Sequence, residues 1–186
     1  MALTHGSPLA FLPGAVVAHL ISRCLRDRKA SLEELSEESL EALFRQFGHQ
    51  YGQTAEIATL VRQAMALAQD ETISHTGAME QLRCETGAQV LAGSGSACLT
   101  CGGDFDAAMI TAVNHSGRSA AVGALTGAVL GARMGARALP EFYLECLEPA
   151  MTLVELADDL YHGCPMEMGN RLFDGDWDRK YLHGGK

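Results

Sequence analysis

Hydrophobic residues recur along most of the chain at the three- and four-residue spacing of a helix. Ser7 and Pro8 can begin the first helix, because a serine caps and a proline is tolerated at the first helical position. Its apolar stripe consists of Leu12, Val16, Val17, Leu20, Ile21 and Leu25. A capping box, Ser31-Leu32-Glu33-Glu34, begins a second helix that ends before Gly48.

The same periodicity predicts four further helices, over residues 54–68, 106–113, 119–136 and 151–161. No long alternating β pattern occurs, and the glycine-containing stretch 85–103 has no assignment from the pattern. The tail 163–186 is polar and glycine-containing, with Trp177 and Tyr181 as candidate anchors. The pattern therefore predicts a single all-α domain over residues 1–162, followed by a polar C-terminal tail.

Four glycines, Gly123, Gly127, Gly131 and Gly135, fall every fourth residue in the predicted helix 119–136. This spacing places them on one helix face. Each costs about 0.5–1 kcal/mol relative to alanine, so close approach of a neighbouring helix is expected to offset the penalty.

Composition narrows the class of protein. The 186 residues are 47% hydrophobic and 20% charged, which suits a globular domain with a core, and the net charge of −9 argues against sequence-independent nucleic-acid binding. The first residues lack the basic start of a secretory signal, and the uncharged stretch 119–132 is too short to span a bilayer. No membrane association is therefore predicted.

The six cysteines do not read as a disulfide framework in a chain of this size, so reduced thiols and a cytoplasmic location are expected. Cys98 and Cys101 have CxxC spacing without a second pair. A zinc or redox role and two half-buried thiols are the alternatives.

A polar turn precedes the glycine-bearing helix. It holds Asn114, His115, Ser116, Gly117 and Ser119, and free backbone N–H groups at such a helix start favour anions. The run 112–127, which contains this turn, resembles the C-terminal metal-binding stretch of the ADP-ribosylglycohydrolases. Residues 4–8 (Thr-His-Gly-Ser-Pro) are similar to that family's Thr-His-Gly-His-Pro turn, and residues 139–144 and 156–161 resemble its last helices.

The resemblance implies an all-α orthogonal multi-helix bundle, of which this chain matches about the second half. It also implies magnesium-dependent hydrolysis of the N-glycosidic bond that joins ADP-ribose to a modified protein or nucleotide. The family pattern Gly-Asp-Ser-Asp-Ser/Thr-Thr-Gly supplies magnesium ligands, but here Arg118 and Ala120 stand where the aspartates would be. Magnesium needs hard oxygen ligands, so we expect no metal ligand and no catalytic residue in this stretch.

The candidate ligand-binding residues are His5, Asn114, His115, Ser116, Gly117, Arg118 and Ser119. The guanidinium of Arg118 either converges with backbone amides on a phosphate or simply reaches solvent. The predicted function is that of an ADP-ribosylglycohydrolase-like protein with weak or lost activity. The alternatives are a non-catalytic module that binds ADP-ribose or phosphate, a subunit that pairs with a chain supplying the family's N-terminal half or with its own copy, and a decayed reading frame.

Overall fold

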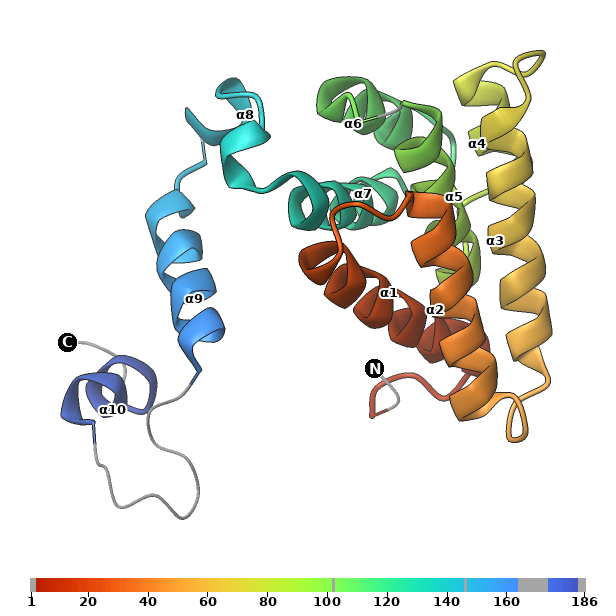
Figure 1. Ribbon diagram of the computed structural model, residues 1–186. Coiled ribbons are helices and arrows are strands. Elements are labelled where there is room, and N and C mark those ends of the chain that lie inside the picture. The colour runs from red at the N-terminus through yellow and green to blue at the C-terminus, as the bar shows by residue number, and fades with distance from the viewer. Residues whose placement is uncertain (1–2, 102, 146, 164–173, 184–186) are drawn as a thin grey trace. The chain divides into compact units, whose positions relative to one another are not determined.

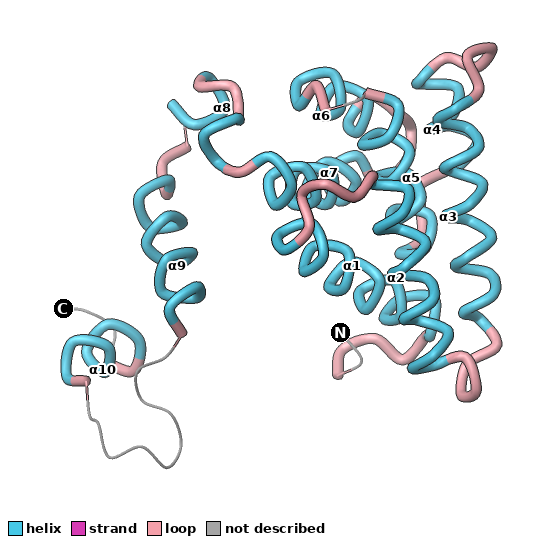
Figure 2. Tube along the Cα trace, viewed as in Figure 1, coloured by secondary structure: helices cyan, strands magenta, loops and turns pink. Residues whose placement is uncertain are grey.

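The computed structural model describes residues 3–101, 103–145, 147–163 and 174–183. Every regular element in these ranges is a helix, and none of them is a strand (Figure 2). The predicted all-α fold is confirmed. By their contacts the residues form two units, 1–140 and 141–186, and each is described by itself below. The division into residues 1–162 and 163–186 that the sequence suggested stays a prediction.

In its described residues, the first unit contains seven α-helices and one short 3-10 helix. These are α1 (Pro8–Arg26), α2 (Leu32–Phe47), α3 (Gln53–Gln69), α4 (His75–Leu82), α5 (Gly87–Thr100), α6 (Phe105–Val113), α7 (Ser119–Met134) and η1 (Ala136–Ala138).

The second unit contains α8 (Phe142–Glu145), α9 (Ala150–His162) and α10 (Gly175–Tyr181). The last of these lies inside the stretch that the sequence suggested was a tail. Its Lys180 Nζ lies 2.5 Å from the Asp159 carboxylate on α9, and the Tyr181 hydroxyl donates to the same carboxylate. Tyr181 is therefore an anchor, as its place in the polar tail suggested.

The helix starts follow the capping signals in part. At α2 the Ser31 hydroxyl oxygen accepts from Glu34 N at 3.1 Å, and the Glu34 carboxylate accepts from Ser31 N at 2.8 Å. This confirms the predicted capping box. At α1 Ser7 and Pro8 occupy the expected positions, but the Ser7 side chain makes no capping hydrogen bond.

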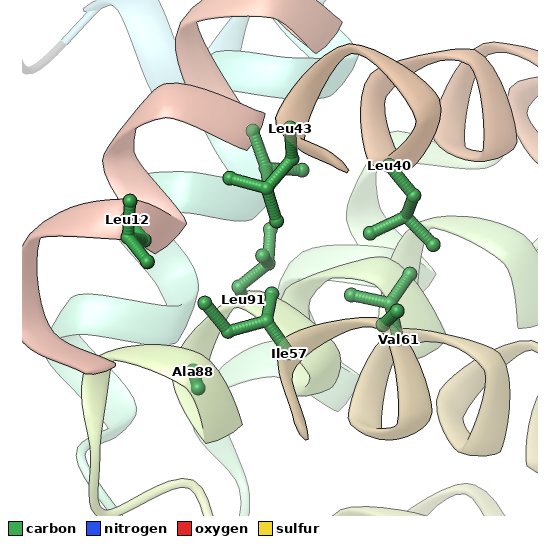
Figure 3. Close-up of a cluster of buried hydrophobic side chains, with 9 residues drawn as sticks. Leu12, Leu40, Leu43, Ile57, Val61, Ala88 and Leu91 are labelled. Carbon is green, nitrogen blue, oxygen red and sulfur yellow. The ribbon is translucent and has the colours of Figure 1, made fainter. Parts of the chain in front are cut away.

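The core of the first unit lies where α1, α2, α3 and α5 meet (Figure 3). Leu12, Leu40 and Ile57 are almost completely buried there, and Leu91 brings α5 into the same cluster. Helix α5 also packs against α4, α6 and α7 (Figure 1). The segment that the sequence pattern left unassigned is thus the helix around which the first unit is built.

Helix α1 is long and apolar enough to cross a membrane by length and hydropathy, and it is the one helix among the described residues that meets both criteria. A helix buried in a protein core can meet the same two criteria. In this structure Leu12, Val16 and Leu20 of α1 are buried in the first unit.

Two glycines of α5 provide a matched pair of substitutions. A Cβ on Gly93 would lie 2.4 Å from Cys84 Sγ and 3.2 Å from Met79 Cε, whereas a Cβ on Gly95 would meet nothing within 4 Å. We expect Gly93→Ala to destabilise the protein by about 1–3 kcal/mol through overpacking. We expect Gly95→Ala to stabilise it by about 0.5–1 kcal/mol through helix propensity. Urea unfolding of both variants checks the pair, and a loss of stability in Gly95→Ala would contradict the open space beside it.

Candidate functional site

The turn between α6 and α7 is closed by hydrogen bonds to its own side chains. Asn114 Nδ2 donates to Ile110 O at 2.7 Å, and Ser119 Oγ donates to His115 O at 3.1 Å. His115 Nδ1 accepts from Gly117 N at 3.0 Å. Because this nitrogen accepts, the proton of the neutral ring lies on Nε2, which donates to Ala112 O at 3.0 Å. His115 therefore holds the turn together through both ring nitrogens.

A carboxylate from α4 occupies the donors of Ser116. Glu80 Oε1 accepts from Ser116 N at 2.8 Å, and Oε2 accepts from Ser116 Oγ at 2.5 Å. The Ser116 hydroxyl, and after it the Ser116 N–H, hold the pKa of the Glu80 carboxyl below its ordinary value. Glu80 thus occupies the backbone N–H and the hydroxyl of Ser116, two donors that an external anion would otherwise use.

The corner that follows α4 holds the turn from its other side. Arg83 and Cys84 have φ values of 62° and 52°, which lie in the left-handed region that residues other than glycine rarely adopt. Arg118 N donates to Cys84 O at 3.0 Å. A Cβ on Gly117 would lie 2.3 Å from Arg83 O, so only glycine allows the two backbones to come this close.

The structure brings six of the seven candidate ligand residues together in one turn. The backbone N–H groups of Ser116, Gly117, Arg118 and Ser119 all donate within the protein. His5 is exposed, its ring nitrogen Nδ1 is 2.7 Å from Thr4 Oγ1, and no contact with the turn joins it to the site among the described residues. Binding of a ligand by these seven residues stays a prediction.

Among the described residues, Arg118 is the one cationic residue at the N-cap and in the first turn of α7. It is exposed, makes no capping hydrogen bond, and forms no ion pair among the residues that the structure describes. A cation in this place opposes the helix dipole, whereas an anion bound beside it would reverse that penalty. Any recognition of an anion at this turn therefore falls to the Arg118 guanidinium.

Magnesium does not fit the residues at this turn. The guanidinium of Arg118 repels a divalent cation, and the methyl group of Ala120 offers no ligand atom. The nearby carboxylate of Glu80 is engaged by Ser116. Over the described residues, no group of three or more His, Cys, Asp or Glu side chains has a geometry that could hold a metal ion.

The CxxC cysteines lie away from this turn, at the end of α5. Cys98 is buried and burial raises the pKa of its thiol to about 12, and burial also raises the pKa of the half-buried Cys101. Both thiols are free. High pKa values leave little thiolate at neutral pH, which disfavours nucleophilic reactivity.

The residues that hold the turn from outside, Glu80 and the Arg83–Cys84 corner, were not predicted from the sequence. Glu80 lies on α4 and the corner comes directly after it, and hydrophobic periodicity did not predict this helix. A local signal exists, because Ser74 caps α4 by accepting from Gly77 N at 3.1 Å. Nothing in the local sequence, however, indicates that Glu80 reaches a turn 36 residues away.

Comparison with known proteins identifies the family. The sequence model described as ADP-ribosylglycohydrolase matches residues 1–169. Comparisons with curated proteins and with solved structures gave no match. The match extends over most of the chain, including α1, α9 and the turn between α6 and α7 (the entrance turn, residues 114–118). The chain therefore belongs to the ADP-ribosylglycohydrolase family.

Proposed function

We propose that this chain is a non-hydrolytic member of its family, with an ADP-ribosylglycohydrolase scaffold whose entrance turn no longer takes magnesium. The observation that carries this proposal is the chemistry of the α7 start. Arg118 and Ala120 replace the two acids of the family pattern, and Glu80 occupies the Ser116 donors. A hydrolase of this kind relies on its metal to order the nucleophile, so loss of the ligands removes the main source of rate acceleration.

The direct test is release of ADP-ribose from an ADP-ribosylated protein in the presence of magnesium. We expect no release above the buffer control, with an intact family hydrolase on the same substrate as the positive control. We also expect millimolar magnesium to leave the Tm unchanged, since a ligand that binds only the folded state raises it. Magnesium-dependent turnover that EDTA abolishes would overturn the proposal.

Loss of hydrolysis leaves open the binding of ADP-ribose through Arg118. Its guanidinium can pair with a phosphate in the bidentate geometry that favours arginine. Calorimetric titration of ADP-ribose into the protein and into Arg118→Ala tests this, with Arg45→Ala, another exposed arginine, as the matched control. Binding that is lost only in Arg118→Ala supports this role. An absence of heat with the unaltered protein rejects it.

A second candidate function, binding of a partner polypeptide, is favoured by α9. Within the second unit, described by itself, Met151, Leu160 and Tyr161 of this helix are 81%, 83% and 87% exposed, and Val154 is 62% exposed. Side chains of this size on one helix are typical of a surface that pairs with another polypeptide segment. We infer that α9 presents an interface to a second copy of the chain or to another helical polypeptide.

Light scattering coupled to size-exclusion chromatography tests the interface. We expect a species larger than the 19.8 kDa monomer, either alone or after mixing with a partner, and its loss in Val154→Ser/Leu160→Ser. A stable monomer that binds no partner would contradict this role. The proposed absence of nucleic-acid binding, which the net charge of −9 favours, can be checked on the same column with DNA or RNA.

A further inference from the structure

A cleft lies at the other end of α7, far from the entrance turn. Its volume is about 250 Å³, and its walls come from the end of α7, the start of α2 and the end of α5. The walls include Leu130 and Arg133 of α7, Leu32 and Glu33 of α2, and Leu99 of α5. The 16 residues of α7 separate this cleft from the entrance turn by roughly 24 Å at 1.5 Å per residue.

Arg133 lines the cleft and carries an unsatisfied donor. Its Nη2 donates to Ala30 O at 2.8 Å, which ties α7 to the loop between α1 and α2. Its Nη1 is buried and has no hydrogen-bond acceptor among the described residues. A buried guanidinium donor without an acceptor is costly, and a carboxylate or phosphate oxygen is the acceptor that satisfies it best.

The surroundings of Arg133 are cationic. Arg28 lies beside the same end of α7, with its Nη2 at 3.8 Å from the position of a Cβ on Gly135. Neither Arg28 nor Arg133 forms an ion pair with an acid among the described residues. Glu33 also lines the cleft, and its negative charge disfavours a dianion more strongly than a monoanion.

The inner part of the cleft is apolar. Leu32, Leu99 and Leu130 line it, and Leu32 and Cys98 are shared with a small internal cavity of about 20 Å³ that Gly95 also lines. A pocket with apolar walls and a few polar groups, here including Glu33 and Arg133, is typical of small-molecule sites. Its volume is below the roughly 300–1,000 Å³ of sites that hold drug-sized ligands, so its ligand is smaller than these.

We propose that this cleft binds a small monocarboxylate with a short alkyl chain. The carboxylate pairs with Arg133 and provides the missing acceptor, and the alkyl chain lies on Leu32, Leu99 and Leu130. Pairing with Nη1 requires a shift of the side chains that bury this atom. The monocarboxylate is preferred over an alkyl phosphate, which carries close to two charges at neutral pH, because Glu33 faces the same space.

Titration of the ¹⁵N-labelled full chain with hexanoate, followed by NMR, tests the proposal. We expect saturable shifts at the Leu99 and Leu130 amides, with hexan-1-ol and butyl phosphate each binding at least about tenfold more weakly than hexanoate. Arg133→Met should weaken hexanoate binding by at least about tenfold. The matched control is Arg137→Met, since Arg137 is an exposed arginine of η1 that does not line the cleft, and it should leave the affinity unchanged.

Three results would overturn the proposal: no saturable shift with hexanoate, equal affinity for hexanoate and hexan-1-ol, or equal effects of Arg133→Met and Arg137→Met. Tighter binding of butyl phosphate would overturn the preference for a monocarboxylate. Arg133 also donates to Ala30 O, so a second variant covers the case in which Arg133→Met does not fold. That variant is Leu99→Trp, which fills the cleft, keeps the arginine and should abolish hexanoate binding.

Discussion

Replacing Gly117 with alanine is expected to destabilise the protein by about 3 kcal/mol or more. The new Cβ would lie 2.3 Å from Arg83 O, 2.8 Å from Cys84 Cβ and 3.0 Å from Cys84 O. Two of these three atoms belong to the backbone, and a hydrogen bond from Arg118 N to Cys84 O holds that backbone in place. The clash therefore breaks the contact between the entrance turn and the corner after α4. Urea denaturation followed by circular dichroism measures the loss.

Gly131 is the matched control, because a Cβ on this glycine of α7 would meet nothing within 4 Å. We expect Gly131→Ala to stabilise the protein by about 0.5–1 kcal/mol, since alanine is the better helix former. A change of less than about 1 kcal/mol in Gly117→Ala would show that the Arg83–Cys84 corner yields easily, against the argument from its two positive φ values.

The four glycines that fall at every fourth residue from Gly123 to Gly135 show how far spacing alone can predict packing. Gly123 has the expected close neighbour, with Val113 Cγ1 of α6 at 2.9 Å from its Cβ position. Gly127 meets Met109 Sδ only at an ordinary 3.7 Å, and Gly131 meets nothing. Gly135 has φ +81° and ends the helix. Sequence spacing places glycines on one face, but it does not show where the neighbouring helix ends.

Helix α5, one of the helices that hydrophobic periodicity did not predict, illustrates the opposite limit. Gly87, Gly93 and Gly95 weaken its intrinsic helix propensity. Burial against α3 and α7 outweighs that weakness, and long-range packing of this kind is not visible in a local pattern. A capping box between Thr86 and Gln89 was a local signal for its start.

At the entrance turn, local chemistry was predictable and its long-range partners were not. The turn's polar residues and its place before a helix followed from adjacent positions in the sequence. Glu80, by contrast, comes from a different helix, and only the folded chain brings its carboxylate to Ser116. The sequence therefore indicated a turn suited to anions without indicating that an internal anion already occupies two of its donors.

In the hydrophobic core, Ile57→Ala is expected to have an effect about as large as that of Gly117→Ala. We expect it to lower the free energy of unfolding by about 3–4 kcal/mol. Ile57 is completely buried in the cluster of Figure 3, where α3 meets α1, α2 and α5. Truncation removes three carbons and leaves a cavity among side chains that four different helices hold in place. The surrounding helices cannot collapse around it without disturbing their own contacts, which puts the cost above the lower end of the usual range. The measurement is the midpoint and slope of urea unfolding.

Ile110→Ala on α6 is the matched control, since it removes the same atoms from a side chain that is 53% exposed. We expect a change below about 1 kcal/mol, because less transfer free energy is lost and no closed cavity forms. Similar losses in the two variants would contradict the exposed position of Ile110, and would show that this side chain is covered in solution.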